Sequence, residues 1–519
     1  MNPGPAEPWW KSAVFYQIYP RSFADGGRGA PGVGDLEGVR RHLDHLHWLG
    51  VDAIWVCPFY PSPMADFGYD IADHCDVDPL FGTLADFDRL VADAHDRGIR
   101  VLIDWVPNHT SDQHPWFVES RSSRDSPKRH WYLWRDRTNN WLAAFGGPAW
   151  TWDPDTAQWY LHLFLPQQPD LDWNNPEVEE AMHGVLRFWL DRGVDGARID
   201  VVHGMVKDPA LPDDPPGTTL PHASLNDWSG AHPVLRRLRA MVDSYPDERV
   251  LVGEVYLLST RQVVPYLGHG DELHLAFDFT SLFAPWDARA WQERLSETAG
   301  ELDRVGGWPT WTLSNHDNSR HRTRYGGSEA LARAAAVLLL TLRGTPFLYA
   351  GEELGLEDAV VPADRVVDPG GRDPCRAPIP WDGGPNHGWE VEHPWLPWPP
   401  DAEHRNAETQ RADPASILHL YRRLIGTRRA SPALHQGSWR LLSAPTGVVA
   451  YERRAGDDHR VVAVNFTAEP ATLDIGILDV GTAGVAGEWR VEVSSDGAGE
   501  GQTFEGTLGP HQAAVLRPD

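Results

Sequence analysis

Apolar residues in the first two thirds of the chain fall into short runs separated by amphipathic segments. Each run is rich in β-branched and aromatic residues and is bounded by turn residues, which is typical of a buried strand. Eight runs are predicted to be strands, and they are residues 13–20, 52–58, 99–106, 197–202, 250–255, 274–279, 310–317 and 344–353.

The segments between these runs carry apolar residues every three or four positions, the spacing of an amphipathic helix. In residues 35–50, Asp35 is suited to cap such a helix and Gly50 to end it. Residues 82–98 and 176–193 show the same pattern, and each leads into the next predicted strand. Strands that alternate with helices predict an α/β fold with parallel strands, and eight such units predict a (β/α)8 TIM barrel.

Two long segments interrupt this alternation and one follows it. Residues 110–172 come after the third strand and are too long for an ordinary loop, so we expect an inserted subdomain there. The final segment alternates apolar and polar residues between turns, which is typical of an antiparallel β-sandwich. The predicted domains are a barrel at 1–109 and 173–436 with a long excursion at 361–412, an inserted subdomain at 110–172, and a C-terminal β-sandwich at 437–519.

The chain is strongly acidic, with 74 Asp and Glu against 46 Lys and Arg and a formal net charge of −28. This charge repels phosphate backbones and anionic lipid headgroups, so we expect neither nucleic acid nor a membrane surface as a partner. The amino terminus lacks the pattern of a signal peptide and no long apolar run occurs, which favours a cytoplasmic location. The three cysteines lack metal-type spacing and are expected to be isolated thiols.

Polar residues gather where the predicted strands end. In a (β/α)8 barrel these carboxyl ends surround one mouth, where the active sites of this fold lie. The residues at these ends are Asp104, Asn108, His109, Arg198, Asp200, Glu254, His316 and Asp317. Several acids at one mouth, without a GxSxG motif, a Cys–His pairing or a zinc-type cluster, indicate acid chemistry on a neutral substrate, and glycoside cleavage is the leading candidate.

Arg198 and Asp200 stand in the otherwise apolar stretch GVDGARIDVVHG, where a buried charge is unfavourable unless it is paired or used. Glycoside cleavage needs one ionised carboxylate near the sugar carbon and a second, protonated one near the departing oxygen. Crowded acids can supply that proton because each ionised carboxylate raises the pKa of its neighbour. Arg198 is then expected to orient Asp200 and keep it ionised.

Five blocks of sequence lie at or near these strand ends, namely DWVPNH (104–109), QPDLDWNNP (168–176), GARIDVVH (196–203), GEVY (253–256) and LSNHDNSR (313–320). Together they resemble glycoside hydrolase family 13, the α-amylase superfamily, and within it the α-glucosidases of the oligo-1,6-glucosidase type. The resemblance implies that Asp200 is the nucleophile, Glu254 the general acid/base and Asp317 the transition-state stabiliser. It implies glucosyl-binding roles for His109, Arg198 and His316.

Two further stretches resemble exo-acting members of the family, which remove one terminal glucose. In ADFGYDI (65–71), Asp66 resembles the carboxylate that binds the non-reducing-end hydroxyls, and Tyr69 the ring on which the sugar stacks. In GRDPCRAPIPW (371–381), Arg376 is expected to pair with Asp66 and close the far wall of the pocket. The implied activity is that of a retaining exo-acting α-glucosidase, which hydrolyses terminal α-linked glucose from maltose- or isomaltose-type oligosaccharides by double displacement.

The loop after the first strand departs from the family pattern. Many relatives bind a divalent metal there through several acids, whereas only Asp25 and Asp35 are present here, so we expect no metal. The resemblance implies no cofactor either. The many tryptophans of the insert are interpreted as the core of a small subdomain rather than as a sugar-stacking surface.

Several functional alternatives stay open on the sequence. A trehalose synthase or another transglucosidase would use the same acids and differ in whether water or a sugar hydroxyl accepts the glucosyl unit. A phosphoglycosidase would need extra basic groups, and a non-catalytic sugar-binding relative would not need all three acids. Val201 resembles the residue of relatives that favour α-1,6 bonds, but this leaves the bond preference open. The expected partner is a small-molecule oligosaccharide or α-glucoside, and the oligomeric state is open.

Overall fold

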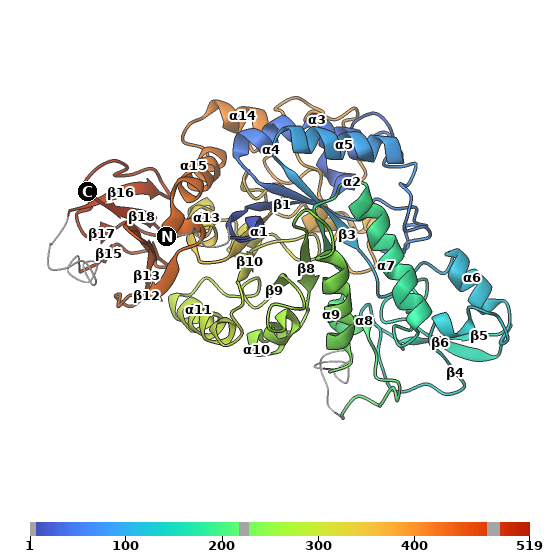
Figure 1. Cartoon of the computed structure of the whole chain (residues 1–519). Coiled ribbons are helices and arrows are strands. Elements are labelled where there is room, and N and C mark those ends of the chain that lie inside the picture. Colours follow the sequence, from blue (N-terminus) through green and yellow to red (C-terminus); the bar gives the residue numbers. More distant parts are fainter. Residues whose placement is uncertain (1–6, 217–227, 475–487) are drawn as a thin grey trace.

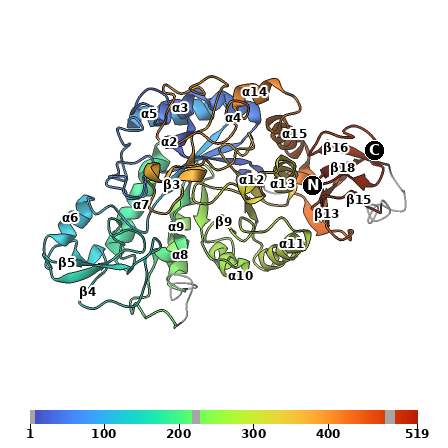
Figure 2. The ribbon, with the colours of Figure 1, turned by 180° about the vertical axis from the view of Figure 1, so that it is seen from behind.

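The computed structural model describes residues 7–216, 228–474 and 488–519. A barrel of strands surrounded by helices forms the middle of the molecule (Figure 1). A small β-subdomain lies on one side of it and an antiparallel sheet domain on the other, and Figure 2 shows the same arrangement from behind. The domain boundaries given above stay predictions.

Eight parallel strands form the barrel sheet. They are β1 (Phe15–Ile18), β2 (Ala53–Val56), β3 (Arg100–Trp105), β7 (Gly196–Ile199), β8 (Val250–Glu254), β9 (Leu275–Phe277), β10 (Thr310–Thr312) and β11 (Thr345–Tyr349). Hydrogen bonds connect them in the order β10-β11-β1-β2-β3-β7-β8-β9, and β9 lies next to β10, so the barrel is nearly closed. The predicted α/β class and (β/α)8 TIM barrel are confirmed.

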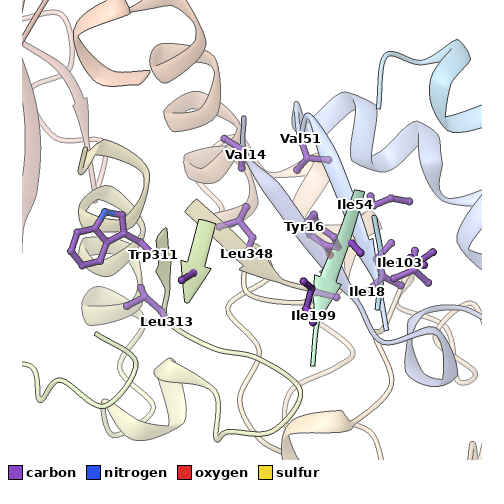
Figure 3. Close-up of a cluster of buried hydrophobic side chains, with 14 of the residues drawn as sticks. Val14, Tyr16, Ile18, Val51, Ile54, Ile103, Ile199, Trp311, Leu313 and Leu348 are labelled. Atoms are coloured by element: carbon purple, nitrogen blue, oxygen red, sulfur yellow. The ribbon is translucent and has the colours of Figure 1, made fainter. Parts of the chain in front are cut away.

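Side chains of each strand point alternately into the barrel and toward the helices, because successive residues of a strand face opposite sides. Trp55 of β2 packs in an interior cluster with Phe15 and Leu102 of the neighbouring strands. Ile54 belongs instead to the large cluster between strands and helices, together with Ile103 (Figure 3). The apolar core therefore has an inner and an outer layer.

Helices cover the outside of the sheet. The α-helices of the barrel are α1 (Trp9–Ser12), α2 (Pro20–Phe23), α3 (Leu36–Arg41), α4 (Leu43–Leu49), α5 (Leu84–Asp96), α7 (Pro176–Asp191), α8 (Val202–Met205), α9 (Ala231–Val242), α10 (Thr260–Val263), α11 (Ala288–Asp303), α12 (His321–Arg324), α13 (Glu329–Thr341), α14 (Ala407–Ala412), α15 (Ile417–Ala430) and α16 (Pro432–His435). The prediction of a single helix over 35–50 is wrong in one respect. The segment forms two helices, because the backbone at His42 leaves the helical conformation. Asp35 caps α3 and Gly50 ends α4 in the left-handed conformation, as predicted.

The segment after β3 forms the β-subdomain. It contains α6 (Pro115–Arg121) and a three-stranded antiparallel sheet of β4 (Trp134–Arg135), β6 (Gln158–Leu161) and β5 (Trp150–Asp153). Trp141 and Trp150 are buried in its apolar cluster, whereas Trp152 is 44% exposed. The indole Nε1 of Trp141 donates to the Pro212 carbonyl at 2.9 Å, which ties this subdomain to the loop after α8.

The C-terminal domain contains a five-stranded antiparallel sheet in the order β12-β13-β14-β18-β16 and a two-stranded ladder of β15 and β17. The strands are β12 (Ser438–Leu441), β13 (Val448–Ala455), β14 (Asp458–Asn465), β15 (Ala471–Thr472), β16 (Trp489–Ser494), β17 (Thr507–Leu508) and β18 (Ala513–Pro518). In β13, Val448 packs with Leu508 of the ladder, whereas Val449 packs in the barrel cluster. Both faces of the large sheet are therefore covered.

All eight predicted strands are longer than the observed ones, and two of these errors concern site residues at the barrel mouth. The strand predicted over 197–202 ends at Ile199 and gives way to α8, because Val201 adopts a left-handed conformation with φ +47°. The strand predicted over 310–317 ends at Thr312, and a turn follows. In the described part of the chain, no helix combines the length and apolar character that crossing a membrane requires.

Candidate active site

Interior positions of the barrel strands change from apolar to polar toward their carboxyl ends. In β3, Leu102 is followed two residues later by Asp104, which points to the same face. Arg198 occupies the corresponding interior position of β7, Asp200 follows that strand directly, and Glu254 is the last residue of β8. The period of two therefore explains how a strand that is apolar toward its helices carries charged residues toward the barrel axis.

A single guanidinium group connects three of these acids. Nη1 of Arg198 donates to Oδ1 of Asp104 and to Oδ1 of Asp200, each at 2.7 Å. Nη2 donates to Oε2 of Glu254 at 2.6 Å. The backbone N–H of Val201 donates to the same Glu254 oxygen at 3.2 Å. Acids from three neighbouring strands are thereby held at one point, where buried charge is compensated by pairing.

A cavity of about 590 Å³ adjoins this network, a volume within the usual range of small-molecule sites. Six of the nine residues singled out from the sequence line it, namely Asp66, Tyr69, His109, Asp200, Glu254 and Asp317. The other three, Arg198, His316 and Arg376, are buried behind the lining. The three acids to which the sequence assigns the chemistry thus lie around one cavity.

Asp317 is held by groups from the long loop after β11. Its Oδ1 accepts from Nη1 of Arg372 at 3.2 Å and from Nη2 of Arg376 at 3.0 Å. Its Oδ2 lies 3.3 Å from Nε2 of His316. The same two arginines also contact the buried carboxylate of Asp368.

The expected ion pair between Arg376 and Asp66 is wrong, because Arg372 takes that place. Nη2 of Arg372 pairs with Oδ1 of Asp66, and both side chains line the cavity. Arg376 lies one turn further along the short 3₁₀-helix Asp373–Arg376 and is fully buried. Its Nε donates to the carbonyl of His316 at 2.7 Å, so its guanidinium lies beneath the lining rather than opposite Asp66.

The other oxygen of Asp66 is bound by the β-subdomain. Nε2 of Gln168 donates to Oδ2 of Asp66 at 2.9 Å and lies 3.1 Å from Nε2 of His109. Gln168 is fully buried. Asp66 is thus oriented from two sides, by Arg372 on the loop after β11 and by Gln168 on the insert.

Tyr69, which lines the cavity, stacks on the buried ring of His316, with ring centroids 5.4 Å apart. The Tyr69 hydroxyl donates to Oδ2 of Asp104 at 2.9 Å and lies 2.5 Å from Nε2 of His316. His316 is fully buried, so in this structure it contacts Tyr69 and Asp317 rather than the cavity.

Protonation differs between the two sides of the cavity. Burial raises the pKa of Asp104 to about 6 and raises that of Asp200 well above its usual range, and the neighbouring Glu254 adds to both shifts. Burial acts in the same direction on Asp317, but His316, Arg372 and Arg376 outweigh it and hold its pKa well below the usual range. The site therefore places a proton-retaining carboxyl and a firmly ionised one around the same cavity.

The acids and the amide that could contribute to a metal site have partners within the protein. Lys207 places its ammonium 2.6 Å from Oδ1 of Asn108 and 2.7 Å from Oδ2 of Asp170, which joins the barrel to the insert. Asp25 and Asp35, in the loop after β1, accept hydrogen bonds from backbone amides. Within the described residues, one group of three potential ligands occurs, Asp401, Glu403 and His404, and it is exposed and not part of the cavity.

Sequence reasoning missed three residues of the site. Arg372 stands in the same GRDPCR stretch as Arg376, and the sequence does not indicate which of the two arginines faces Asp66. Gln168 opens the block QPDLDW and could have been noted there. Lys207 is one of only three lysines in the chain, and that rarity was the available signal.

Barrel, cavity and acids together define a glycoside hydrolase. A family model, the α-amylase catalytic domain, matches residues 17–437. The chain belongs to this family, glycoside hydrolase family 13, and is an enzyme of the glycoside hydrolase class.

Three relatives illustrate the range of similarity. A probable α-glucosidase of Rhizobium meliloti is 41% identical over 512 residues, which cover 91% of this chain and 92% of that protein. An oligo-1,6-glucosidase of Parageobacillus thermoglucosidasius is 36% identical, over 88% of this chain and 90% of that protein. The crystal structure of XgtA, described as an α-glucosyl transfer enzyme, is 40% identical and superimposes with a TM-score of 0.89 over 99% of this chain and 100% of that one.

Proposed function

We propose that the protein is a retaining, exo-acting α-glucosidase that hydrolyses terminal α-linked glucose from maltose- or isomaltose-type oligosaccharides. The observation that carries this proposal is the convergence of Asp200, Glu254 and Asp317 on one cavity, with Arg198 bonded to both Asp200 and Glu254. The similarity to proteins named α-glucosidase and oligo-1,6-glucosidase supports the substrate class.

In the proposed reaction, Glu254 donates a proton to the glycosidic oxygen while a carboxylate oxygen of Asp200 attacks the anomeric carbon. The bond to the aglycone breaks and a glucosyl ester on Asp200 forms. In the second half, Glu254 takes a proton from water, the water oxygen attacks the same carbon, and the ester bond breaks. Asp317 stays ionised throughout and stabilises the positive charge that develops on the sugar.

The reaction needs an ionised Asp200, whereas burial raises the pKa of Asp200 in the free site, so the expectation that Arg198 keeps this carboxyl ionised is wrong there. Asp200 shares Arg198 with Glu254, and its raised pKa means that the Asp200 carboxyl retains a proton near neutral pH. We infer that bound substrate places this proton on Glu254, because the acid has to face the departing oxygen.

The exo-action is proposed from the pair of Asp66 and Arg372. Both side chains line the cavity and are bonded to each other, and Gln168 holds Asp66 from the insert. A glucan chain cannot pass between two bonded side chains. The pair therefore closes one end, so that a single terminal sugar fits between it and the acids.

A transglucosidase is the second candidate, and the similarity to XgtA is the observation that favours it. A phosphoglycosidase is less suited, because Arg372 is the one guanidinium among the described lining residues and three acids already contact it. Water and sugar acceptors use the same glucosyl ester, so products distinguish hydrolysis from transfer.

The test is a panel of maltose, isomaltose, trehalose, sucrose and an aryl α-glucoside, with products followed by NMR from the first minutes. We expect α-glucose as the first product and preferred cleavage of maltose or isomaltose. Initial release of β-glucose would contradict double displacement. New disaccharides in place of free glucose would favour the transglucosidase, and no turnover of any member would reject both.

A further inference from the structure

Gln17 is a buried polar residue of the barrel interior to which no role has so far been given. It lies on β1 two residues after Phe15, so its side chain points into the barrel, and it is 2% exposed. Its Nε2 lies 2.7 Å from Nδ1 of His316 and 3.2 Å from Sγ of Cys57. The amide of Gln17 therefore contacts the ring nitrogen of His316 that faces away from the cavity.

Asp104, Tyr69 and His316 form a chain of hydrogen bonds. The donors and acceptors along it follow from the carboxylate of Asp104. Oδ2 of Asp104 accepts from Nε1 of Trp55, which can only donate, and Oδ1 is bound by Arg198. Asp104 is thus an acceptor at both oxygens. The hydroxyl of Tyr69, 2.9 Å from Oδ2, has one proton and donates it to Asp104.

The direction continues from Tyr69 to the imidazole. Because the hydroxyl proton of Tyr69 points to Asp104, the 2.5 Å contact with Nε2 of His316 requires a proton on that nitrogen. Burial lowers the pKa of His316 to about 3, so the ring is neutral and carries one proton only. Nδ1 is then an acceptor, and the group that satisfies it is the amide N–H of Gln17.

The opposite orientation of the Gln17 amide is inconsistent with the same hydrogen bonds. With the Gln17 oxygen toward His316, Nδ1 would carry the ring proton and Nε2 would be an acceptor. Nε2 and Asp104 would then both require the single hydroxyl proton of Tyr69. One of these buried groups would be left unsatisfied, which is unfavourable.

We propose that Gln17 is a positioning residue that fixes His316 as the Nε2–H tautomer and thereby orients Tyr69 and Asp317 at the cavity. In this tautomer the N–H lies beside both the Tyr69 oxygen and Oδ2 of Asp317, 3.3 Å away. In the other tautomer a lone pair would face the Asp317 carboxylate and repel it. Gln17 acts on the reaction through His316 and never contacts substrate.

The direct test is the protonation of His316, observed by nitrogen NMR on histidine-labelled protein, with a His316→Asn variant to assign the signal. We expect Nε2 to show the shift of a protonated ring nitrogen and Nδ1 that of an unprotonated one. The opposite pair of shifts in the parent protein would overturn the proposal. This readout needs no substrate, so it stands or falls separately from the proposed function.

Two variants separate tautomer control from packing. In Gln17→Glu the side chain keeps its size but offers only acceptors, so we expect a proton on Nδ1 of His316. In Gln17→Met the side chain neither donates nor strongly accepts, so we expect a mixture of tautomers. Cys57→Ala is the matched control, because it removes the other partner of the same amide and leaves the Gln17 bond to His316 in place. Parental shifts in both Gln17 variants would overturn the proposal.

The kinetic consequence rests on the proposed function. For Gln17→Met we expect kcat and kcat/KM on an α-glucoside to fall together by about 10- to 100-fold, because a hydrogen bond to a group that acts in the transition state is weakened. Cys57→Ala should stay within about threefold of the parent. A changed tautomer with parental kcat would show that the orientation has no catalytic effect and would overturn that half of the proposal. If Gln17→Glu does not fold, Gln17→Met alone decides.

Discussion

Two charge clusters at the cavity contain the same number of acids but different numbers of arginines. The Arg198 cluster consists of Asp104, Asp200, Glu254 and Arg198. The double-arginine cluster consists of Asp66, Asp317, Asp368, Arg372 and Arg376. The acids of both clusters are largely or fully buried, so burial alone cannot separate their behaviour.

The pKa values separate according to the charge balance. In the Arg198 cluster, burial prevails: the pKa of Asp104 is about 6 and that of Asp200 is well above its usual range. In the double-arginine cluster, burial again acts upward, but His316 and the two arginines lower the pKa of Asp317, and the two arginines lower that of Asp368. The amount of positive charge around a buried carboxyl therefore decides whether it keeps its proton.

This difference matches the division of labour that a glycosidase needs. A proton that is given and taken back has to be available near neutral pH, and the Arg198 cluster retains one. A carboxylate that stabilises developing positive charge must stay ionised, and the double-arginine cluster holds Asp317 in that form.

Replacing the proposed nucleophile should have the largest effect. Asp200→Asn keeps the size of the side chain and an acceptor for Arg198, but removes the attacking carboxylate. We expect kcat on an aryl α-glucoside to fall by about 10⁴-fold or more, with an unchanged circular dichroism spectrum. Asp155→Asn, on the exposed surface of the insert, is the control and should keep parental activity. Substantial turnover by Asp200→Asn would remove Asp200 from the proposed mechanism.

The two arginines of the second cluster should differ in what they control. Arg372→Lys loses the fork that reaches both Asp66 and Asp317, so we expect KM to rise by about 10- to 100-fold as the terminal sugar loses its oriented carboxylate. Arg376→Lys leaves the Asp66 pair in place and should change KM by less than about threefold. Steady-state kinetics on maltose and isomaltose measure both. A larger KM effect from Arg376→Lys would favour the pairing expected from the sequence.

The fold and the Arg198 cluster could be predicted from sequence because both follow from periodicity. Eight apolar runs give the strands, and the fixed geometry of a barrel brings their carboxyl ends together. Asp104 and Arg198 stand at paired interior positions of the neighbouring strands β3 and β7. Asp200 directly follows β7, and Glu254 is the last residue of β8, the next strand of the sheet. No information beyond strand order was needed to place these residues at one mouth.

The double-arginine cluster could not be placed in the same way. Arg372 and Arg376 belong to a long loop without regular period, so sequence gives no reason to prefer either as the partner of Asp66. The break at His42 was missed for a related reason, because the apolar spacing continues through it. Strand ends were also placed too late at Val201, whose left-handed backbone no propensity indicates for a β-branched residue.

The smallest predicted effect is a difference in thermal stability with opposite sign in the two clusters. The folded-state pKa of Asp200 lies above its value near 4 in the unfolded chain, so its ionisation destabilises the fold as pH rises above about 4. The folded-state pKa of Asp317 lies below that value, so its stabilising contribution is present above about pH 4 and is lost as pH falls.

At pH 7.5, Asp200→Asn should therefore melt higher than the parent and Asp317→Asn lower, each by on the order of 2 °C. The gain from Asp200→Asn should shrink as pH approaches 4, because the parent carboxyl is then protonated in both states. The loss of melting temperature from Asp317→Asn should begin to shrink only below about pH 4, because Asp317 is then protonated in the unfolded chain and still ionised in the folded one. Scanning calorimetry between about pH 3.5 and 8 measures both curves. If both variants shift the melting temperature in the same direction, the Arg198 cluster stabilises an ionised carboxylate as well as the double-arginine cluster does. The proposed difference between the two clusters would then be wrong.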